Sequence, residues 1–292
     1  MEIRKAELGE LQQLMKNELL HLYPEREIRG IISVLFSHLT GFSPAQLVLQ
    51  KSRKLSESEI HFLQRALKRL LQHEPVQYIT GKAFFYGFEF EVNKDVLIPR
   101  PETEELVDWI IRDSDSGQKL DAVDIGTGCG CIAVSLKKHM PGTSIDAVDI
   151  SGGALSLAEK NAVIHGAAIN FIHGSILDET FRDTMGIYDL IVSNPPYVSR
   201  EDREKMLPNV TAFEPALALF VDEDPLLFYR EIIKFSLDHL SKGGSLYFEC
   251  NETFTGQVAE LLKSAGSYEI EIRSDMQGKK RMLKGIKSGH FE

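Results

Sequence analysis

The chain has 292 residues, of which 43% are hydrophobic and 26% are charged, as in an ordinary globular protein. Its 43 acidic side chains outnumber its 33 basic ones, and the net charge of −10 argues against a protein that mainly coats nucleic acid or an anionic membrane. There is no apolar run near the ~20 residues of a membrane span, no secretion signal and no disulfide framework, so we expect a cytoplasmic protein of about two domains.

Residues 1–73 predict a small helical bundle. The apolar residues between 8 and 22, and again between 28 and 39, recur every three or four positions, so each series forms one apolar stripe on a helix. A third stripe, between 60 and 71, follows the capping-box sequence Ser56-Glu57-Ser58-Glu59. Helices of this kind bury their stripes against one another. The bundle is either a structural cap or a domain that docks a substrate.

Residues 74–98 are expected to form short strands and a β-hairpin that link the bundle to the rest of the chain. Tyr78-Ile79 and the aromatic residues that follow favour extended structure. Phe88, Phe90 and Val92 alternate with polar or acidic neighbours, which indicates a strand with one buried face. Core packing explains this aromatic cluster better than a ligand site does.

Residues 99–292 alternate between helices and strands. Pro101 and the carboxylates after it open a helix, and later helices are expected from Cys131, over 154–164, and from Asp224-Pro225 to near Gly243-Gly244. Strands are expected at 122–125, 145–150, 169–172, 189–192, 246–248, 268–272 and 281–286. This alternation predicts an α/β fold with a doubly wound, mainly parallel, seven-stranded Rossmann-like sheet that helices cover on both faces.

The turn after the first of these strands is rich in glycine. Gly126, Gly128 and Gly130 allow the backbone to approach a ligand closely, and the helix that follows offers free N–H groups. The dinucleotide-binding pattern G-x-G-x-x-G requires a third glycine where Cys131 stands. The spacing therefore argues against a nicotinamide or flavin enzyme.

Two carboxylates accompany this turn. Asp124, just before the glycines, would repel a diphosphate but can accept hydrogen bonds from an ammonium group, directly or through water. Asp149 ends the second strand, where a carboxylate can accept hydrogen bonds from two ribose hydroxyls. A ribose without a pyrophosphate predicts S-adenosyl-L-methionine as the cofactor. The alternative is a turn with a purely structural role.

The sequence Asn194-Pro195-Pro196-Tyr197 directly follows an apolar strand. Its prolines remove two backbone donors and leave carbonyl groups free to accept, while Asn194 adds a side-chain oxygen and Tyr197 a ring face. Such a turn can hold a planar –NH2 group by both hydrogens. Methylation of an amide or an exocyclic amine requires this, because the nitrogen must turn its lone pair out of conjugation. The alternative is a stiff surface turn with a buried aromatic residue.

Together these motifs resemble the class I S-adenosylmethionine methyltransferases that modify planar amine nitrogens. The run Leu97-Ile98-Pro99-Arg100-Pro101-Glu102-Thr103-Glu104 narrows the resemblance to the release factor glutamine methyltransferases. Phe213-Glu214-Pro215 and Gly278-x-x-Arg281 also match that family. The resemblance extends from about Glu74 to Gly285, and the helical N-terminal domain is of the kind that the family carries.

The resemblance implies methylation of N5 of the glutamine side chain in the Gly-Gly-Gln motif of bacterial class 1 peptide chain release factors, with release of S-adenosyl-L-homocysteine. The residues whose positions match the family's cofactor contacts are Gly126, Thr127, Gly128, Cys129, Gly130, Asp149, Ile176 and Asn194. The glutamine would be bound by Asn194, Pro195, Pro196 and Tyr197, with Asn194, Pro195 and Tyr197 as catalytic residues. Positioning would supply most of the catalysis of an in-line displacement without a covalent enzyme intermediate.

Two positions depart from the family pattern. Ser175 stands where the family often has an aspartate, which weakens the expected contact with adenine. Cys250-Asn251-Glu252 stands where a glycine and soon a glutamine usually follow Glu249, so the role of this loop is left open. Arg100 is expected either to contact the acceptor protein or to pair with Glu102 or Glu104.

Two other functions remain as alternatives. An adenine-N6 methyltransferase of DNA or RNA uses a similar turn on an extruded base, although the net charge of −10 counts against it. A binding protein with the same fold and no catalysis is the second. We expect no metal site, because Cys129-x-Cys131 lacks the spacing of one. The expected partner is a release factor, with no membrane or direct nucleic-acid binding, and the protein is expected to be a monomer.

Overall fold

The computed structural model describes residues 6–114, 118–198, 208–221, 224–266 and 268–288. The chain forms two compact units. We call the first the helical unit, which contains the described residues up to Gly81 together with α11 (Pro208–Phe213). The second, the sheet unit, contains the other described residues from Lys82 onward. The domain boundaries expected after residues 73 and 98 stay predictions.

The helical unit is built from short and medium helices. In chain order they are α1 (Leu8–Leu19), α2 (Glu25–Thr40), α3 (Pro44–Leu49), α4 (Glu57–Leu70) and α5 (Val76–Thr80). The predicted capping box begins α4: Ser56 Oγ accepts a hydrogen bond from the Glu59 N–H at 3.3 Å, and Glu59 Oε2 accepts one from the Ser56 N–H at 2.7 Å. Two of the N–H groups that a helix start leaves unpaired are satisfied in this way.

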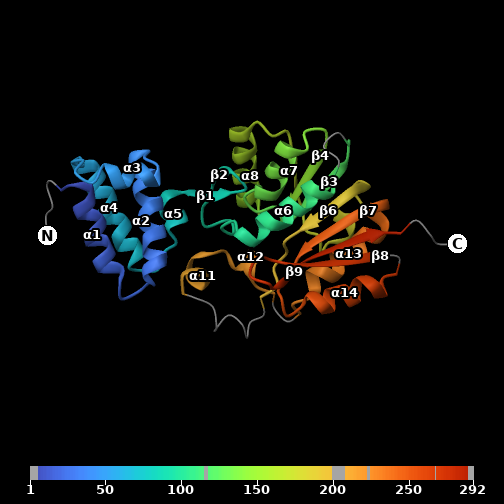
Figure 1. The fold of residues 1–292 in the computed structure, drawn as a ribbon. Helices are drawn as coiled ribbons and strands as arrows, with labels where there is room; N and C mark the ends of the chain where they lie inside the picture. The colour runs from blue at the N-terminus through green and yellow to red at the C-terminus, as the bar shows by residue number, and fades with distance from the viewer. Residues whose placement is uncertain (1–5, 115–117, 199–207, 222–223, 267, 289–292) are drawn as a thin grey trace. The chain divides into compact units, whose positions relative to one another are not determined.

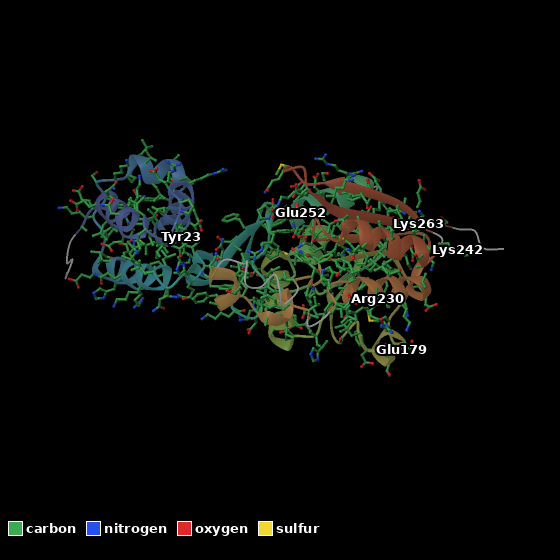
Figure 2. The ribbon with its side chains drawn as sticks, turned by 90° about the horizontal axis from the view of Figure 1, so that it is seen from below. Tyr23, Glu179, Arg230, Lys242, Glu252 and Lys263 are labelled. Carbon is green, nitrogen blue, oxygen red and sulfur yellow. The ribbon has the colours of Figure 1, made fainter. Side chains whose placement is uncertain are left out.

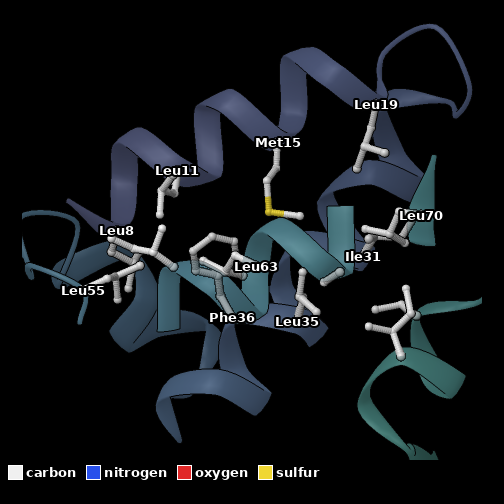
Figure 3. Close-up of a cluster of buried hydrophobic side chains, with 14 of the residues drawn as sticks. Leu8, Leu11, Met15, Leu19, Ile31, Leu35, Phe36, Leu55, Leu63 and Leu70 are labelled. Atoms are coloured by element: carbon white, nitrogen blue, oxygen red, sulfur yellow. The ribbon is translucent and has the colours of Figure 1, made fainter. Parts of the chain in front are cut away.

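The apolar stripes of these helices meet in one buried core (Figure 3). Leu8, Leu11, Met15 and Leu19 of α1 are all buried, and they face the apolar side chains of α2 and α4. Each fully buried leucine contributes roughly 1.5–3 kcal/mol relative to an exposed one. The helical unit therefore has a core of its own, as the stripes predicted.

Tyr78 and Ile79 do not form the predicted strand. They lie in α5, a helix of five residues that ends at Gly81, where φ is +71°. A short apolar run does not distinguish a strand from a buried helical turn, so the left-handed glycine was the better signal here. The predicted hairpin begins directly afterwards, with β1 (Lys82–Phe85) antiparallel to β2 (Phe88–Glu91). Its turn residues, Tyr86 and Gly87, both have positive φ, as in a type I′ turn.

A seven-stranded sheet forms the centre of the sheet unit. Its spatial order is β5-β4-β3-β6-β7-β9-β8. In chain order the strands are β3 (Asp121–Ile125), β4 (Ser144–Asp149), β5 (Asn170–His173), β6 (Tyr188–Ser193), β7 (Leu240–Glu249), β8 (Tyr268–Ser274) and β9 (Lys280–Lys287). Strands β3 to β7 pair in parallel, whereas β9 is antiparallel to both β7 and β8. The prediction of a mainly parallel, seven-stranded sheet is confirmed.

Helices cover both faces of this sheet (Figure 1). The helices of the sheet unit are α6 (Pro101–Asp113), α7 (Cys131–His139), α8 (Gly152–His165), α9 (Glu179–Arg182), α12 (Ala216–Leu219), α13 (Leu227–His239) and α14 (Thr255–Ser264). Trp109 of α6 packs edge-on against Tyr247, and Tyr229 of α13 packs edge-on against Phe248. Because neighbouring residues on β7 point to opposite faces, α6 and α13 cover opposite faces of the sheet.

The end of α13 differs from the prediction. The helix ends at His239, and Gly243-Gly244 lie within β7 instead of closing the helix. The register of β6 against β7 shifts between Tyr188 and Leu190, where the glycine pair bulges out of the ladder. A bulge needs the backbone freedom of glycine, and Gly243 has a φ of +78°.

Charged side chains lie on the outside of the sheet unit. Glu179, Arg230, Lys242, Glu252 and Lys263, which Figure 2 labels, are all exposed. This is the ordinary position of a charged group, because burial of an unpaired charge is costly. Throughout the described residues, no helix has the length and apolar character needed to span a membrane.

Candidate active site

A cavity of about 410 Å³ opens at the carboxyl ends of the parallel strands of the sheet unit. Its lining includes residues that follow β3, β4, β5 and β6, together with residues before α6 and on α12 and α13. The strand order reverses between β3 and β6, since β4 lies on one side of β3 and β7 on the other side of β6. Open α/β sheets bind ligands at such a reversal. The size is also in the range of small-molecule sites.

The glycine turn forms one wall of this cavity. Gly126 and Gly128 have φ values of +77° and +56°, and a Cβ atom on either would meet nothing within 4 Å. The turn is held to β4, because the N–H groups of Gly126 and Thr127 both donate to the Val148 carbonyl, at 2.8 and 3.0 Å. Thr127 and Cys129 also line the cavity. The backbone is therefore open to close approach by a ligand, as the sequence predicted.

Gly130, expected at the cofactor, is not part of the lining. A Cβ atom on this residue would lie 3.1 Å from the Cβ atom of Ala158, and φ is +80°. Gly130 therefore allows the start of α7 to approach α8 closely. Its effect on the cavity is indirect, through the position of the turn.

Asp149 reaches the cavity from the end of β4. Its Oδ2 accepts a hydrogen bond from the Gly128 N–H, and its Oδ1 accepts one from the Ser151 N–H, both at 2.9 Å. Burial raises the pKa of this carboxyl, and the backbone N–H groups act in the opposite direction. A carboxylate has about four acceptor positions. Asp149 is thus fixed in place and still able to accept hydrogen bonds from a ligand.

Asp124 does not line the cavity, so its side chain is not placed for direct contact with a ligand there. The side chain is fully buried under the glycine turn, where its Oδ2 accepts a hydrogen bond from Thr127 Oγ1 at 2.7 Å. Burial raises the pKa of Asp124 to about 7. Because helices cover both faces of the sheet, the side chain of Asp124 is buried inside the protein. There it stabilises the glycine turn through its hydrogen bond with Thr127.

The Asn194 turn forms another part of the same cavity. Asn194, Pro195 and Pro196 line the cavity, whereas Tyr197 does not. The Tyr197 ring packs against the apolar core that contains Tyr229, and burial raises the pKa of its hydroxyl to about 12. Three of the four expected substrate residues are therefore brought together beside the glycine turn, and the fourth anchors the turn to the core.

Two polar residues behind this turn were not expected in the site. Asn194 Nδ2 donates to Thr103 Oγ1 at 3.2 Å, and Thr103 Oγ1 donates to Glu249 Oε2 at 2.5 Å. Glu249 is only 2% exposed, and burial raises the pKa of its carboxyl to about 7. Thr103 lies in the run 97–104, and Glu249 directly precedes the loop that departs from the family pattern. The sequence did not indicate their contact, because the two residues are 146 positions apart.

The cavity also has an apolar wall that the sequence did not indicate. Ile150, Leu177 and Leu217 are 55%, 40% and 71% exposed, which is unusual for large apolar side chains, and all three line the cavity. Ile176, expected beside adenine, lies in the same lining and is buried. Exposed apolar side chains at a cavity suit a flat ring, because binding removes their surface from water.

Arg100 pairs with Glu214, so the expected alternative of a pair with Glu102 or Glu104 is wrong, whereas a contact with the acceptor protein stays a prediction. Arg100 Nη2 donates to Glu214 Oε1 at 2.6 Å, while Glu214 Oε2 accepts a hydrogen bond from the Ile98 N–H at 3.2 Å. The ion pair ties the segment before α6 to the start of α12. The side chain of Arg100 is one-third exposed and lines the cavity, so it can still meet a ligand.

The cysteines are unbridged and buried. Cys129 and Cys131 both line the cavity, and their mutual hydrogen bond together with burial raises the pKa of the Cys131 thiol. In the described part of the chain, no three His, Cys, Asp or Glu side chains gather in a group able to hold a metal ion.

Comparison with known proteins identifies the family. Residues 10–81 match the model of the PrmC N-terminal domain, and residues 106–212 match that of the methyltransferase small domain. The release factor glutamine methyltransferase of Flavobacterium psychrophilum is 40% identical over 270 residues, which cover 91% of this chain and 94% of that protein. The chain belongs to the release factor glutamine methyltransferase family. A second member, from Bacteroides thetaiotaomicron, is 37% identical over 278 residues and covers 94% of this chain and 99% of its own length.

A solved structure agrees on the fold of this family member. A methyltransferase from Pyrococcus furiosus superposes with a TM-score of 0.52 over 77% of this chain and 98% of its own, at 17% identity. At that identity the likeness concerns the fold alone. The predicted fold class, with a methyltransferase sheet and a helical N-terminal domain, is confirmed together with the predicted family.

Proposed function

We propose that this protein transfers a methyl group from S-adenosyl-L-methionine to N5 of the glutamine in the Gly-Gly-Gln motif of bacterial class 1 release factors. The observation that carries the proposal is the Asn194-Pro195-Pro196 turn, which shares one cavity with the glycine turn and Asp149. An acceptor turn for a planar –NH2 group thus lies beside a set of groups suited to a nucleoside. Membership in the family supports the same reaction.

The cavity fits S-adenosyl-L-methionine by the chemistry of its lining. Gly126 and Gly128 leave open backbone for the methionine part, and the Asp149 carboxylate retains acceptor positions for two ribose hydroxyls. Ile176 and Ile150 offer apolar surface to the adenine ring. The bound cofactor supplies an electrophilic methyl group. Thr127 and Cys129 would complete its surroundings, with Gly130 acting through the position of α7.

Asn194 and Pro195 would bind and orient the substrate amide. An amide nitrogen is a poor nucleophile, because its lone pair is delocalised into the carbonyl group. The side-chain oxygen of Asn194 and the main-chain carbonyl of Pro195 would accept the two hydrogens and hold the lone pair toward the cofactor. Positioning of this kind can lower a barrier by roughly 7–11 kcal/mol. Pro196 would border the glutamine, and Tyr197, whose ring packs against the core outside the cavity lining, would hold the turn in place.

The nitrogen needs no strong base before the transfer. Once it carries the methyl group, it is acidic enough to lose its extra proton to water. The residues of the turn therefore act by holding hydrogens and excluding alternative geometries, which agrees with the absence of a titratable side chain from Asn194, Pro195 and Pro196.

A transfer assay with radiolabelled methyl groups tests this proposal. The acceptors are a release factor, the same factor with its Gly-Gly-Gln glutamine replaced by alanine, and unmethylated DNA. We expect label on the wild-type factor alone. Label on DNA would favour the adenine-N6 alternative, and label on no acceptor would favour a non-catalytic binding protein.

A further inference from the structure

A chain of three side chains runs behind the proposed substrate turn. Asn194 follows β6, Thr103 lies in the first turn of α6, and Glu249 ends β7. The Asn194 amide nitrogen donates to the Thr103 hydroxyl at 3.2 Å, and this hydroxyl donates to Glu249 at 2.5 Å. Thr103 and Glu249 are 3% and 2% exposed, so the contact between these two side chains is shielded from water.

The direction of this chain follows from the number of hydrogens. A threonine hydroxyl has one hydrogen, and an ionised carboxylate can only accept. The Thr103 hydrogen is therefore taken up by Glu249, and Thr103 can offer Asn194 only an acceptor. The end of the Asn194 amide that faces Thr103 must then be the –NH2 end, because the hydrogen-bond network decides how an amide is oriented.

We propose that Thr103 and Glu249 are positioning residues, which hold the Asn194 amide with its oxygen toward the –NH2 group of the substrate. The inference rests on the proposed function, because it names what orients the acceptor turn. With the amide reversed, Asn194 would present hydrogens to the hydrogens of the substrate. The substrate nitrogen would then lose one of the two hydrogen-bond acceptors that fix the direction of its lone pair.

The ionised state of Glu249 determines the direction of the chain. A protonated Glu249 can donate to Thr103, which frees the threonine hydrogen to donate to Asn194 and reverses the amide. Burial raises the pKa of Glu249, and the nearby carboxylate of Glu102 raises it further. The hydrogen bond from Thr103 lowers this pKa, and so do the positive charges of Arg281 and Arg100. The other ionisable side chains that face Glu249 are those of Tyr197, Tyr229 and Cys250. The pKa of about 7 lies within the range in which the enzyme would be assayed.

The test compares Thr103→Val with Thr103→Ser. Valine keeps the shape of threonine without the hydroxyl, whereas serine keeps the hydroxyl. Thr255→Val is the matched control: Thr255 is 1% exposed, and its hydroxyl lies 2.7 Å from the Lys280 carbonyl and 3.0 Å from the Asn251 carbonyl, so its one hydrogen has an acceptor outside the cavity. For each variant we would measure kcat for methyl transfer, the Kd of the cofactor by calorimetry, and the melting temperature.

We expect Thr103→Val to lower kcat roughly 10- to 100-fold, as a misplaced substrate group does. The cofactor Kd should change far less, and Thr103→Ser should recover most of the rate. Thr255→Val should lose stability without losing kcat. A Thr103→Val enzyme with wild-type kcat overturns the inference. So does a folded Thr103→Ser enzyme that is as slow as Thr103→Val, because the hydroxyl would then not be the cause.

A second variant tests the carboxylate. In the wild type, kcat should rise about tenfold from pH 6 to pH 8 as a group with a pKa near 7 ionises. Glu249→Gln cannot ionise, while its side-chain oxygen can still accept from Thr103, so this rise should disappear. A Glu249→Gln enzyme with the same pH profile as the wild type contradicts the proposed role of Glu249.

The assay separates this inference from the proposed function. If wild-type enzyme labels DNA and not a release factor, the proposed function fails. The Thr103 variants are then compared on DNA, since adenine also offers a planar –NH2 group. If the wild type labels no acceptor, both are overturned.

Discussion

Replacement of Asn194 by alanine is the most informative single change in the proposed pocket. The substitution removes the side-chain oxygen proposed to accept a substrate hydrogen, together with the hydrogen bond from Nδ2 to Thr103. The bond between Thr103 and Glu249 does not involve Asn194, so the buried carboxylate keeps its partner. We therefore expect the variant to fold, at a cost of about 1 kcal/mol for one lost hydrogen bond.

The expected loss in rate is much larger than the loss in stability. Removal of one preorganised hydrogen-bonding group from an active site raises the barrier by roughly 2.7–4 kcal/mol, which corresponds to about 10²–10³ in kcat. The cofactor retains Asp149 and the glycine turn, and its Kd should change by less than about tenfold. We therefore expect kcat to fall much further than the affinity for the cofactor.

The assay measures single-turnover methyl transfer to a release factor and cofactor binding by calorimetry, both for Asn194→Ala and for a matched control. Asn170→Ala is suitable, because Asn170 is exposed and its Nδ2 makes one bond, to Asp146, at 2.9 Å. The control should retain the wild-type rate. An Asn194→Ala enzyme with near-wild-type turnover would refute the role of Asn194, and equal losses in kcat and cofactor affinity would assign it to cofactor binding alone.

Three further predictions concern the cofactor wall and the turn beneath it. Asp149→Ala should weaken cofactor binding by roughly 10- to 100-fold in calorimetry, since hydrogen bonds to a charged group contribute ~1.5–3 kcal/mol; unchanged affinity would remove Asp149 from the ribose site. Asp124 has a folded-state pKa raised to about 7, so its stabilising contribution is present at low pH and decreases as pH rises through that value. Between pH 6 and 8 this group should cost the wild type about 1.4 kcal/mol of unfolding free energy, so in urea titrations the loss should be about 1.4 kcal/mol smaller in Asp124→Asn, which keeps Glu249. Gly130→Ala should lower the unfolding free energy by about 1–3 kcal/mol, because its φ is +80° and its Cβ atom would meet Ala158 at 3.1 Å. Gly152→Ala, which meets nothing within 4 Å, is the control, and equal melting temperatures for the two variants would contradict this explanation.

Local patterns predicted the parts of the site that lie within one turn. The glycine turn between Gly126 and Gly130 and the turn at 194–197 are continuous in sequence, and each follows a strand. Because parallel strands end at the same edge of the sheet, recognising the strands was enough to bring both turns together. The same reasoning located Asp149 at the end of β4.

Contacts between distant residues could not be predicted in this way. Thr103 and Glu249 are 146 residues apart, and Arg100 and Glu214 are 114 apart, so no spacing rule joins them. Arg100 had nearby carboxylates in the sequence, but the fold supplied a more buried partner, whose side chain is 1% exposed.

Short segments also depend on their surroundings. Tyr78-Ile79 has strand-like residues, yet it forms a helical turn between Pro75 and Gly81, where both side chains are buried. Tertiary packing and the left-handed glycine decide the structure of so short a run. The apolar cavity wall at Ile150 and Leu217 depends in the same way on the assembled sheet unit.

The mass of the methylated product tests the proposed methyl transfer directly. A release factor would be incubated with this protein and S-adenosyl-L-methionine, digested, and sequenced by tandem mass spectrometry. We predict one added methyl group on the side-chain nitrogen of the Gly-Gly-Gln glutamine, and none when Asn194→Ala replaces the wild type over the same short time. A methyl group on another residue, or an unmodified glutamine after prolonged incubation with wild-type enzyme, would contradict it.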